Sequence, residues 1–200
     1  EQVEKWSSQI IRLYKYAIKE KKELNVITLI REPISRNISA FFSNFERDVG
    51  VPFAQSKFTT TQLKDIFLSC DTGGNYHFWI LDWFDKNIKN ILGIDVFAYP
   101  FPQNGYAIYK KQNIRLLIMK LETPDDLKVE AIKEFLGLKE FCLFKFHTAD
   151  QQEYADAYKD FKTKIKLPAD YVEKMTVSEL VNHFYSEDEI QTMINKWGDS

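Results

Sequence analysis

Cysteine is scarce in this sequence. The 200 residues contain two, Cys70 and Cys142, whereas small secreted domains held together by disulfides use many more. This scarcity argues against a disulfide-stapled scaffold and favours a reducing compartment, so we predict a cytoplasmic location. One bridge between the two cysteines remains open at this stage. Neither has an activating residue nearby in the sequence, and we predict that both are small buried hydrophobic residues rather than nucleophiles.

Long apolar runs are also lacking. No window approaches the roughly 18 uninterrupted apolar residues of a membrane-spanning helix, and the stretch EQVEKWSSQI at residues 1–10 has no apolar signal core. We therefore predict no transmembrane segment in this chain. The chain begins at Glu1 rather than methionine, inside a helical pattern. We expect a single domain over residues 1–200 that is truncated at its N-terminus, where a missing part could carry an anchor or a signal.

Charge of one sign is missing too. Lysine and arginine number 27 and aspartate and glutamate 29, which gives a net charge of −2. This balance argues against a general nucleic-acid binder, which needs a basic face, but it leaves room for a small basic pocket. The three histidines, His77, His147 and His183, are far apart and have no cysteine partner at metal-binding spacing, so no metal site is predicted. A serine hydrolase has no support, because the Gly-x-Ser-x-Gly motif is absent.

The apolar residues that are present predict an α/β protein. Residues 25–30 and 114–121 form short apolar runs typical of strands buried on both faces. Helices are predicted for residues 3–22, from Pro33 to Phe45, within 61–70, for 77–92, from Pro124 to Gly137, for 150–165 and for 176–185. Thr123 is the predicted cap of the helix that starts at Pro124, and a last helix is predicted after a capping box at Ser186 and Glu189. Residues 94–101 are predicted to form a strand or an extended piece. We predict a parallel sheet flanked by helices, with a helix-rich C-terminal third.

A basic residue and hydroxyl groups directly follow the first strand, in NVITLIREPISRNISAFF at residues 25–42. A helix N-terminus attracts anions, and the guanidinium of Arg31 matches phosphate oxygens. Ser39 lies about 9 Å along the helix from Pro33 at ~1.5 Å per residue, within reach of a long side chain. The pattern therefore predicts a phosphate on the flank of the helix, in contact with Arg31 and Ser39. The alternative, that Arg31 pairs with a carboxylate and Ser39 only packs, stays open.

The same segment resembles the second signature of the sulfotransferases. The matching residues are Arg31, Glu32, Pro33, Arg36 and Ser39. Two further stretches, IRLLIMKLETPDDLKVEAIKEFLGL and HFYSEDEIQTMINKW, are similar to parts of that family, and WFDKNIKNILGIDVFAYPF resembles a branch described as putative capsular polysaccharide synthesis proteins. The resemblance covers most of residues 25–197.

This resemblance implies a P-loop-like sulfotransferase fold. It implies transfer of a sulfuryl group from 3′-phosphoadenosine 5′-phosphosulfate (PAPS) to a hydroxyl of a carbohydrate, such as a capsular or surface polysaccharide, without a metal. Arg31 and Ser39 would hold the 3′-phosphate of the donor, with Arg36 in support. The resemblance identifies no catalytic base in this chain.

One part that the resemblance leads us to expect is absent. Sulfotransferases carry a phosphosulfate-binding loop before the arginine segment, and such loops need glycine, yet residues 1–24 contain none. The chain is then either a truncated piece of an enzyme or a naturally reduced homologue, and we expect this piece alone to be inactive. The alternative function is a non-catalytic sulfotransferase-like module that binds a nucleotide or a glycan, or serves as a scaffold.

Aromatic residues between 76 and 109 are the candidates for binding the carbohydrate acceptor. Three tyrosines flank a loop with two prolines and could stack on sugar rings: Tyr99, Tyr106 and Tyr109. The alternative is that these aromatic residues fill the core. His77 could act as a general base toward a sugar hydroxyl, or be a structural or surface residue. Basic residues beside the loop would suit an acidic glycan: Lys110, Lys111 and Arg115.

Overall fold

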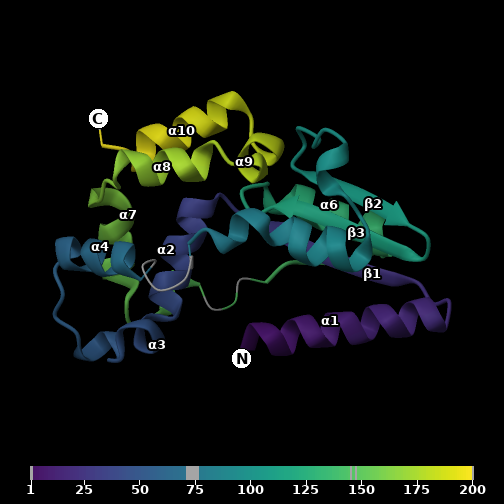
Figure 1. The fold of residues 1–200 in the computed structure, drawn as a ribbon, viewed down its shortest axis with the longest axis horizontal. Helices are drawn as coiled ribbons and strands as arrows, with labels where there is room; N and C mark the ends of the chain where they lie inside the picture. The colour runs from purple at the N-terminus through teal and green to yellow at the C-terminus, as the bar shows by residue number, and fades with distance from the viewer. Residues whose placement is uncertain (1, 71–76, 145, 147, 200) are drawn as a thin grey trace. The chain divides into compact units, whose positions relative to one another are not determined.

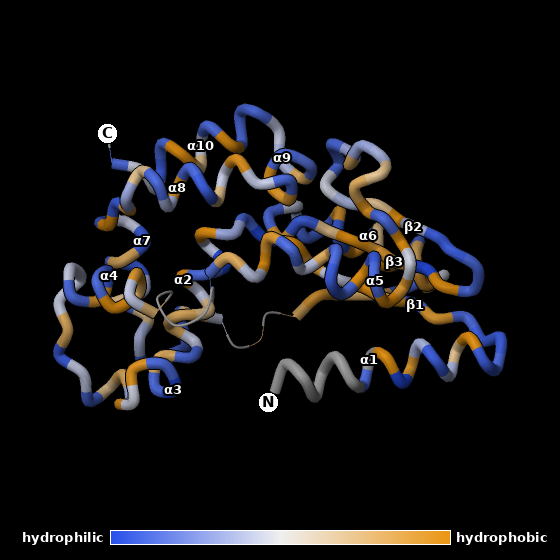
Figure 2. Tube along the Cα trace, viewed as in Figure 1, coloured by the Kyte–Doolittle hydropathy of each residue, from blue (hydrophilic) through white to orange (hydrophobic). Residues whose placement is uncertain are grey.

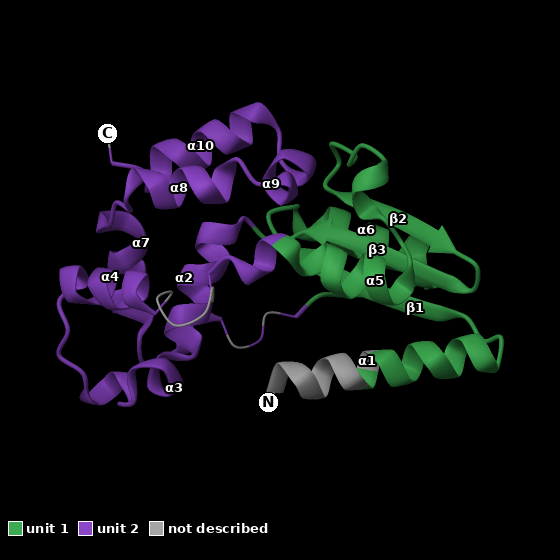
Figure 3. Ribbon diagram, in the orientation of Figure 1, with its two compact units in different colours: residues 1–31, 82–143 green, residues 32–81, 144–200 purple. Residues whose placement is uncertain are grey.

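The computed structural model of the chain describes residues 2–70, 77–144, 146 and 148–199, with side chains from residue 9 on except that of residue 10. The predicted chain break at Gly73 and Gly74 lies outside these residues, as does His147. The chain divides into two compact units (Figure 3). Unit 1 comprises residues 1–31 and 82–143, and unit 2 comprises residues 32–81 and 144–200. The single domain expected from the sequence stays a prediction.

Unit 1 contains a three-stranded sheet with the strand order β1-β3-β2 (Figure 1). β1 (Leu24–Ile30) runs parallel to β3 (Ile114–Lys120), whereas β2 (Tyr106–Lys111) pairs with β3 in the antiparallel sense. β3 is buried at six of its seven positions, and Figure 2 shows it as hydrophobic, as its apolar run predicted. The sheet is mixed rather than parallel throughout, so the α/β class is confirmed but a P-loop-like sulfotransferase fold gains no support.

The second strand, β2, was not predicted. It is joined to β3 by a two-residue turn at Gln112 and Asn113, in which Gln112 has a φ of +53°. Positive φ is typical of such hairpin turns, but their usual signal is a glycine that is missing here. The side-chain amide of Asn113 donates to the carbonyl groups of Ala17 and Lys22. The turn therefore fastens the end of helix α1 (Gln2–Lys19) to the sheet.

Helix α6 (Asp125–Leu136) packs on this sheet. The shared core consists of residues from β3 and α6: Leu117, Met119, Ala131, Ile132 and Phe135. α6 ends at Gly137 with a φ of +68°, as predicted. The predicted cap is wrong, because Pro124 takes the N-cap position and the hydroxyl of Thr123 instead donates to the carbonyl of Gly105 at 3.1 Å.

The helix predicted for residues 77–92 is present but irregular. It consists of a 3₁₀ turn, η2 (Trp79–Asp82), a π-helical turn, η3 (Phe84–Lys89), and a short α-helix, α5 (Asn90–Leu92). Gly93 ends it in the left-handed conformation, as predicted. Residues 94–101 contain a 3₁₀ turn, η4 (Val96–Ala98), rather than a strand, because the side chain of Asp95 accepts the N–H of Phe97 and caps this turn.

Unit 2 is helical within its described residues. Its elements are α2 (Pro33–Ser43), α3 (Phe45–Val49), η1 (Phe53–Gln55), α4 (Thr60–Ser69), η5 (Ala149–Gln151), α7 (Ala155–Lys164), α8 (Ala169–Thr176), α9 (Glu179–Phe184) and α10 (Glu187–Trp197). The capping box of Ser186 and Glu189 is present at the start of α10. These elements confirm the helix-rich last third.

The predicted apolar face of α2 lies in an aromatic core. Phe41 and Phe42 are each about 1% exposed and meet edge to face with ring centroids 5.3 Å apart. Both rings contact Phe161 of α7, and Phe41 also contacts Phe67 of α4. Such aromatic pairs contribute about 0.5–1.5 kcal/mol each beyond the area they bury. The core therefore fixes the rotation of α2 within unit 2.

The two cysteines are free thiols. Cys70 is partly buried, but Cys142 is exposed, so the prediction of two buried cysteines is wrong for Cys142. No helix in the described part of the chain is long and apolar enough to cross a membrane. Over the same residues, no group of histidine, cysteine, aspartate and glutamate side chains is arranged to hold a metal ion.

Candidate functional site

The predicted junction of strand, tight turn and helix is present. β1 ends at Ile30 and α2 begins at Pro33. Arg31 ends the first segment of unit 1, whereas Arg36 and Ser39 lie on α2 in unit 2, and all three are partly exposed. The convergence of Arg31 and Ser39 on one phosphate stays a prediction.

Glu32 occupies the N-terminus of α2. Its carboxylate oxygens accept hydrogen bonds from the backbone N–H groups of Ile34 at 2.9 Å and Ser35 at 2.8 Å. Pro33 has no N–H to offer. The indole Nε1 of Trp197 also donates to Glu32, at 2.9 Å. The first N–H groups of the helix are thus already bound to an internal anion, so a phosphate ligand has to contact the flank of α2 rather than its tip.

Arg36 is held in place on that flank. Its guanidinium lies over the ring of Trp79, with Cζ 4.8 Å from the ring centroid, and its Nη1 donates to Oδ1 of Asn37 at 3.1 Å. Asn37 is fully buried, and its Nδ2 donates to the carbonyl of His77 and the hydroxyl of Tyr171. The cation is therefore fixed before any anion arrives, which lowers the entropy lost on binding.

His77, the candidate general base, is fully buried. Its ring stacks on Phe67 with centroids 4.3 Å apart and meets Tyr171 edge to face at 5.6 Å. A base that acts on a sugar hydroxyl has to reach that hydroxyl directly or through one water, which would require the surrounding aromatic core to open. The burial of His77 favours its structural alternative.

The tyrosines near the proline loop are brought together. They line a hollow of about 410 Å³ on unit 1, which we call the tyrosine pocket. Its lining residues are Tyr99, Pro100, Pro102, Asn104, Tyr106, Ala107, Ile108, Tyr109 and Glu134. Tyr99 is 70% exposed, so its ring is accessible to a ligand. Tyr106 and Tyr109 are partly buried.

The polar groups of this pocket centre on Tyr106. Its hydroxyl lies 3.5 Å from Oε2 of Glu134, and its backbone N–H donates to Oδ1 of Asn104 at 3.4 Å. Burial, the negative charges of Glu134 and Glu130, and the hydrogen bond to Glu134 all raise the pKa of Tyr106 above its usual value, with burial as the largest cause. Its phenol therefore stays neutral at physiological pH and acts as a hydrogen-bond donor rather than as a base.

The loop that forms the pocket is anchored at Gly105. The carbonyl of Gly105 accepts the N–H of Lys120 at 2.8 Å as well as the hydroxyl of Thr123. Gly105 has a φ of +84°, and a Cβ at this position would collide with Thr123. The sequence did not point to Glu134, because a glutamate on a helix becomes informative only once α6 is known to pack beside β2.

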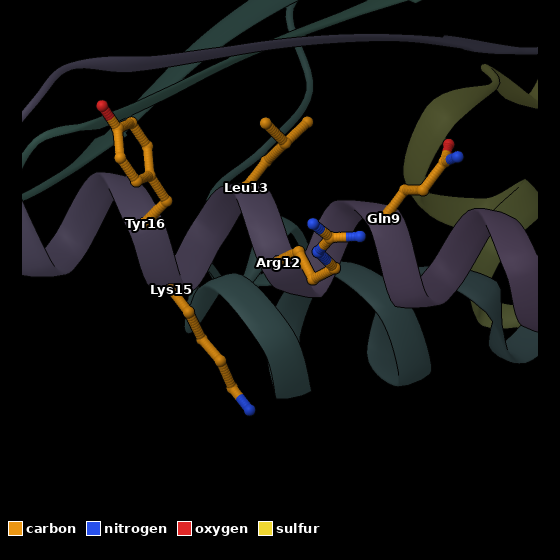
Figure 4. A pocket seen from close by; sticks show the side chains of 5 residues that line it. All are labelled: Gln9, Arg12, Leu13, Lys15 and Tyr16. Atoms are coloured by element: carbon orange, nitrogen blue, oxygen red, sulfur yellow. The ribbon is translucent and has the colours of Figure 1, made fainter.

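Two other hollows are weaker candidates. One, of about 520 Å³, is lined by residues of α1 alone: Gln9, Arg12, Leu13, Lys15 and Tyr16. Figure 4 shows these side chains diverging from a single helix, so they do not converge on a ligand. The other, of about 540 Å³, lies along η5 and α7 in unit 2 and is lined by acidic and basic side chains together.

Comparison with known proteins gives one match. A profile of the family described as "putative capsular polysaccharide synthesis protein" matches residues 58–186, while no curated protein and no solved structure matches. All the residues of the tyrosine pocket lie inside the matched region, and Arg31, Arg36 and Ser39 precede it. Because the match covers more than half of the chain, the chain belongs to this family of putative capsular polysaccharide synthesis proteins.

Proposed function

We propose that this chain contributes the 3′-phosphate site to the transfer of a sulfuryl group from PAPS to a sugar hydroxyl in capsular polysaccharide synthesis. Family membership supports the polysaccharide. The observation that supports PAPS as the donor is the placement of Arg36. Its guanidinium is fixed by Trp79 and Asn37 on the flank of the helix that follows β1. The resemblance of residues 31–39 to the sulfotransferase signature adds Arg31 and Ser39 to the proposal.

The residues of this segment fit the phosphate groups of such a donor. Arg31 and Arg36 supply positive charge and paired N–H donors for phosphate oxygens, and the hydroxyl of Ser39 supplies one more donor. The bound donor would provide the sulfuryl group, which forms a bond to the acceptor oxygen as its bond to the phosphate oxygen breaks. The negative charge left by this step falls on the 5′-phosphate of the donor, whereas Arg31 and Ser39, with Arg36 in support, hold its 3′-phosphate and so position the sulfuryl group for the acceptor. No residue is assigned as the base that takes the hydroxyl proton.

A second function, a non-catalytic glycan-binding module, is favoured by a different observation. The tyrosine pocket lies within the residues that define the family, whereas Arg31, Arg36 and Ser39 lie before them. A protein that only holds the polysaccharide needs the pocket and not the arginines.

The amount of ester sulfate in the capsular polysaccharide tests the proposal. It is measured in cells that make the protein with Arg31→Ala, Arg36→Ala or the control Arg47→Ala, whose guanidinium is exposed and pairs with the adjacent Asp48 at 2.7 Å. We expect sulfate in the wild type and in Arg47→Ala, and a loss of sulfate in the other two. The proposal of sulfuryl transfer is overturned if the wild-type polysaccharide contains no sulfate, or if the wild type and the three variants give equal amounts of sulfate. The non-catalytic glycan-binding module then remains as the proposed function.

A further inference from the structure

We infer that the tyrosine pocket binds a sugar ring of the polysaccharide and selects neutral or amino sugars over acidic ones. This inference rests on the proposed function only in taking a polysaccharide as the substrate. It names the class of sugar that the chain accepts.

The size and shape of the pocket suit a small polar ring. Its volume of about 410 Å³ falls within the range of about 300–1,000 Å³ that is usual for small-molecule sites. The exposed ring of Tyr99 and the side chain of Pro102 supply apolar surface. The C–H face of a sugar packs well on such surface, while its hydroxyl groups point to polar neighbours.

The polar neighbours are arranged to receive hydroxyl groups. The hydroxyl of Tyr106 and the carboxylate of Glu134 are 3.5 Å apart, which is beyond the usual range of about 2.5–3.0 Å for an O–H···O hydrogen bond. A sugar hydroxyl can accept from Tyr106 and donate to Glu134, and thus replace one long bond by two shorter ones. Asn104 lines the pocket and is exposed, and its side-chain amide offers a further donor to a sugar.

The charge of the pocket gives its selectivity. Glu134 is the one charged side chain among the residues that line it, and Glu130 lies close enough to raise the pKa of Tyr106 together with Glu134. Lys110, the next residue of β2, does not line the pocket. A carboxylate on the sugar would meet a like charge, whereas an ammonium group would pair with Glu134.

Two of the three basic residues that had suggested an acidic glycan, Lys111 and Arg115, are engaged elsewhere in unit 1. Lys111 donates to the carbonyl of Gly93. The guanidinium of Arg115 lies 4.7 Å from the ring centroid of Phe135 and pairs with Glu23 at 3.6 Å. These contacts hold Lys111 and Arg115 outside the tyrosine pocket, so the expected preference for an acidic glycan gains no support from them there.

The pocket is formed before ligand binds. Tyr106 packs against the core shared by β3 and α6, and the carbonyl of Gly105 accepts two hydrogen bonds from the residues at and after the end of β3. Binding a sugar therefore orders little of the protein, which leaves more of the contact energy as affinity.

Three tetrasaccharides of different charge test the inference by titration calorimetry with the full chain. They are cellotetraose, which is neutral, the glucosamine tetramer, which is cationic, and tetragalacturonate, which is anionic. We expect the first two to bind and tetragalacturonate to bind at least tenfold more weakly. Tyr99→Ala should weaken binding of the first two by about two- to tenfold, the effect of losing one aromatic contact. Glu134→Gln should narrow the difference between the neutral and the anionic oligomer.

The matched control is Tyr16→Ala, which removes an exposed tyrosine of α1 in the same unit. It should leave all three affinities unchanged. The inference is overturned if none of the three oligomers binds, if tetragalacturonate binds as well as cellotetraose, or if Tyr16→Ala and not Tyr99→Ala weakens binding. Failure here while Arg31→Ala still removes sulfate from the capsule rejects the pocket alone, and the reverse pattern rejects sulfuryl transfer alone.

Discussion

The indole Nε1 of Trp197 donates a hydrogen bond of 2.9 Å to Oε1 of Glu32, although the two residues are 165 positions apart in the sequence. Trp197 is 0% exposed and Glu32 is 7% exposed. The same carboxylate caps α2, so one side chain links the end of α10 to the start of the helix that carries Arg36 and Ser39. This contact fixes the start of α2 within unit 2.

The contact between Glu32 and Trp197 should therefore be needed for stability. Trp197→Phe removes the hydrogen-bond donor from the buried carboxylate of Glu32. We expect unfolding in urea to show a free energy of unfolding lower by about 1.5–3 kcal/mol, the usual contribution of a hydrogen bond to a charged group. The smaller ring of phenylalanine adds a further loss. Glu32→Gln retains an oxygen for the N–H groups of α2. In a double-mutant cycle, the two changes should couple by more than about 0.5 kcal/mol. Strictly additive effects would show that the hydrogen bond adds no stability.

Gly105 should tolerate alanine less well than Gly137 does. Both have positive φ, but a Cβ at Gly105 meets the side chain of Thr123, whereas a Cβ at Gly137 meets nothing within 4 Å. Gly137→Ala should cost about 1–2 kcal/mol, the strain of the left-handed conformation. Gly105→Ala should lower the free energy of unfolding, measured in urea, by clearly more than Gly137→Ala does. It should also weaken cellotetraose binding, because the loop that forms the tyrosine pocket shifts. Equal costs would contradict this account of the loop.

Tyr106 should ionise at a higher pH than a free tyrosine does. Its pKa is raised by burial and by Glu134 and Glu130, so Glu134→Gln should lower that pKa toward the usual value of about 10. NMR of the Tyr106 ring carbon across alkaline pH measures both values. An unchanged pKa in Glu134→Gln would mean that the two side chains do not interact in solution.

The same shift has a consequence for stability. Folding favours the neutral phenol of Tyr106, and this preference contributes to the free energy of unfolding. The contribution is complete below the unfolded pKa of about 10 and is lost as the pH rises through the higher folded pKa. Tyr106→Phe has no ionisable group at this position, so its free energy of unfolding should fall less steeply above pH ~10 than that of the wild type. Parallel alkaline profiles for the two proteins would contradict the sign of this shift.

The two thiols should differ in reactivity. Burial and the negative charge of Asp48 raise the pKa of Cys70 above its usual value, and Cys142 is exposed. Because the thiolate is the reactive form, iodoacetamide should alkylate Cys142 first at mildly alkaline pH. Peptide mass spectrometry follows the two sites, and Cys142→Ser should leave only the slow phase. Faster labelling of Cys70 would contradict its partly buried position.

Local pattern was enough to predict much of the fold. The spacing of Ile34, Ile38, Phe41 and Phe42 predicts the buried face of α2, and these four residues are at most 1% exposed. The apolar run in β3 and the left-handed glycines at the ends of α5 and α6 were likewise readable. Each of these features is decided by neighbours within a few residues.

Structural features that depend on residues far apart in the chain could not be predicted from the sequence. β2 carries exposed positions and a turn without glycine, so it looks like the flank of β3 rather than a strand. Glu32 looked like the acidic position of a signature, and its partner Trp197 lies at the other end of the chain. Of the candidate site residues, Tyr99 and Tyr106 line one pocket because the proline loop leads back to β2. Arg115 instead pairs with Glu23 and contacts the ring of Phe135.

The most direct test of the central claim compares adenosine 3′,5′-bisphosphate with adenosine 5′-monophosphate as ligands of the wild-type chain and of Arg31→Ala. If Arg31 contacts the 3′-phosphate, calorimetry should show that Arg31→Ala weakens binding of the bisphosphate by about 10- to 150-fold, the equivalent of one hydrogen-bonded charge contact. Its affinity for the monophosphate should stay the same. An equal loss for both ligands, or no loss for either, would contradict the claim that this arginine recognises the donor of a sulfuryl group.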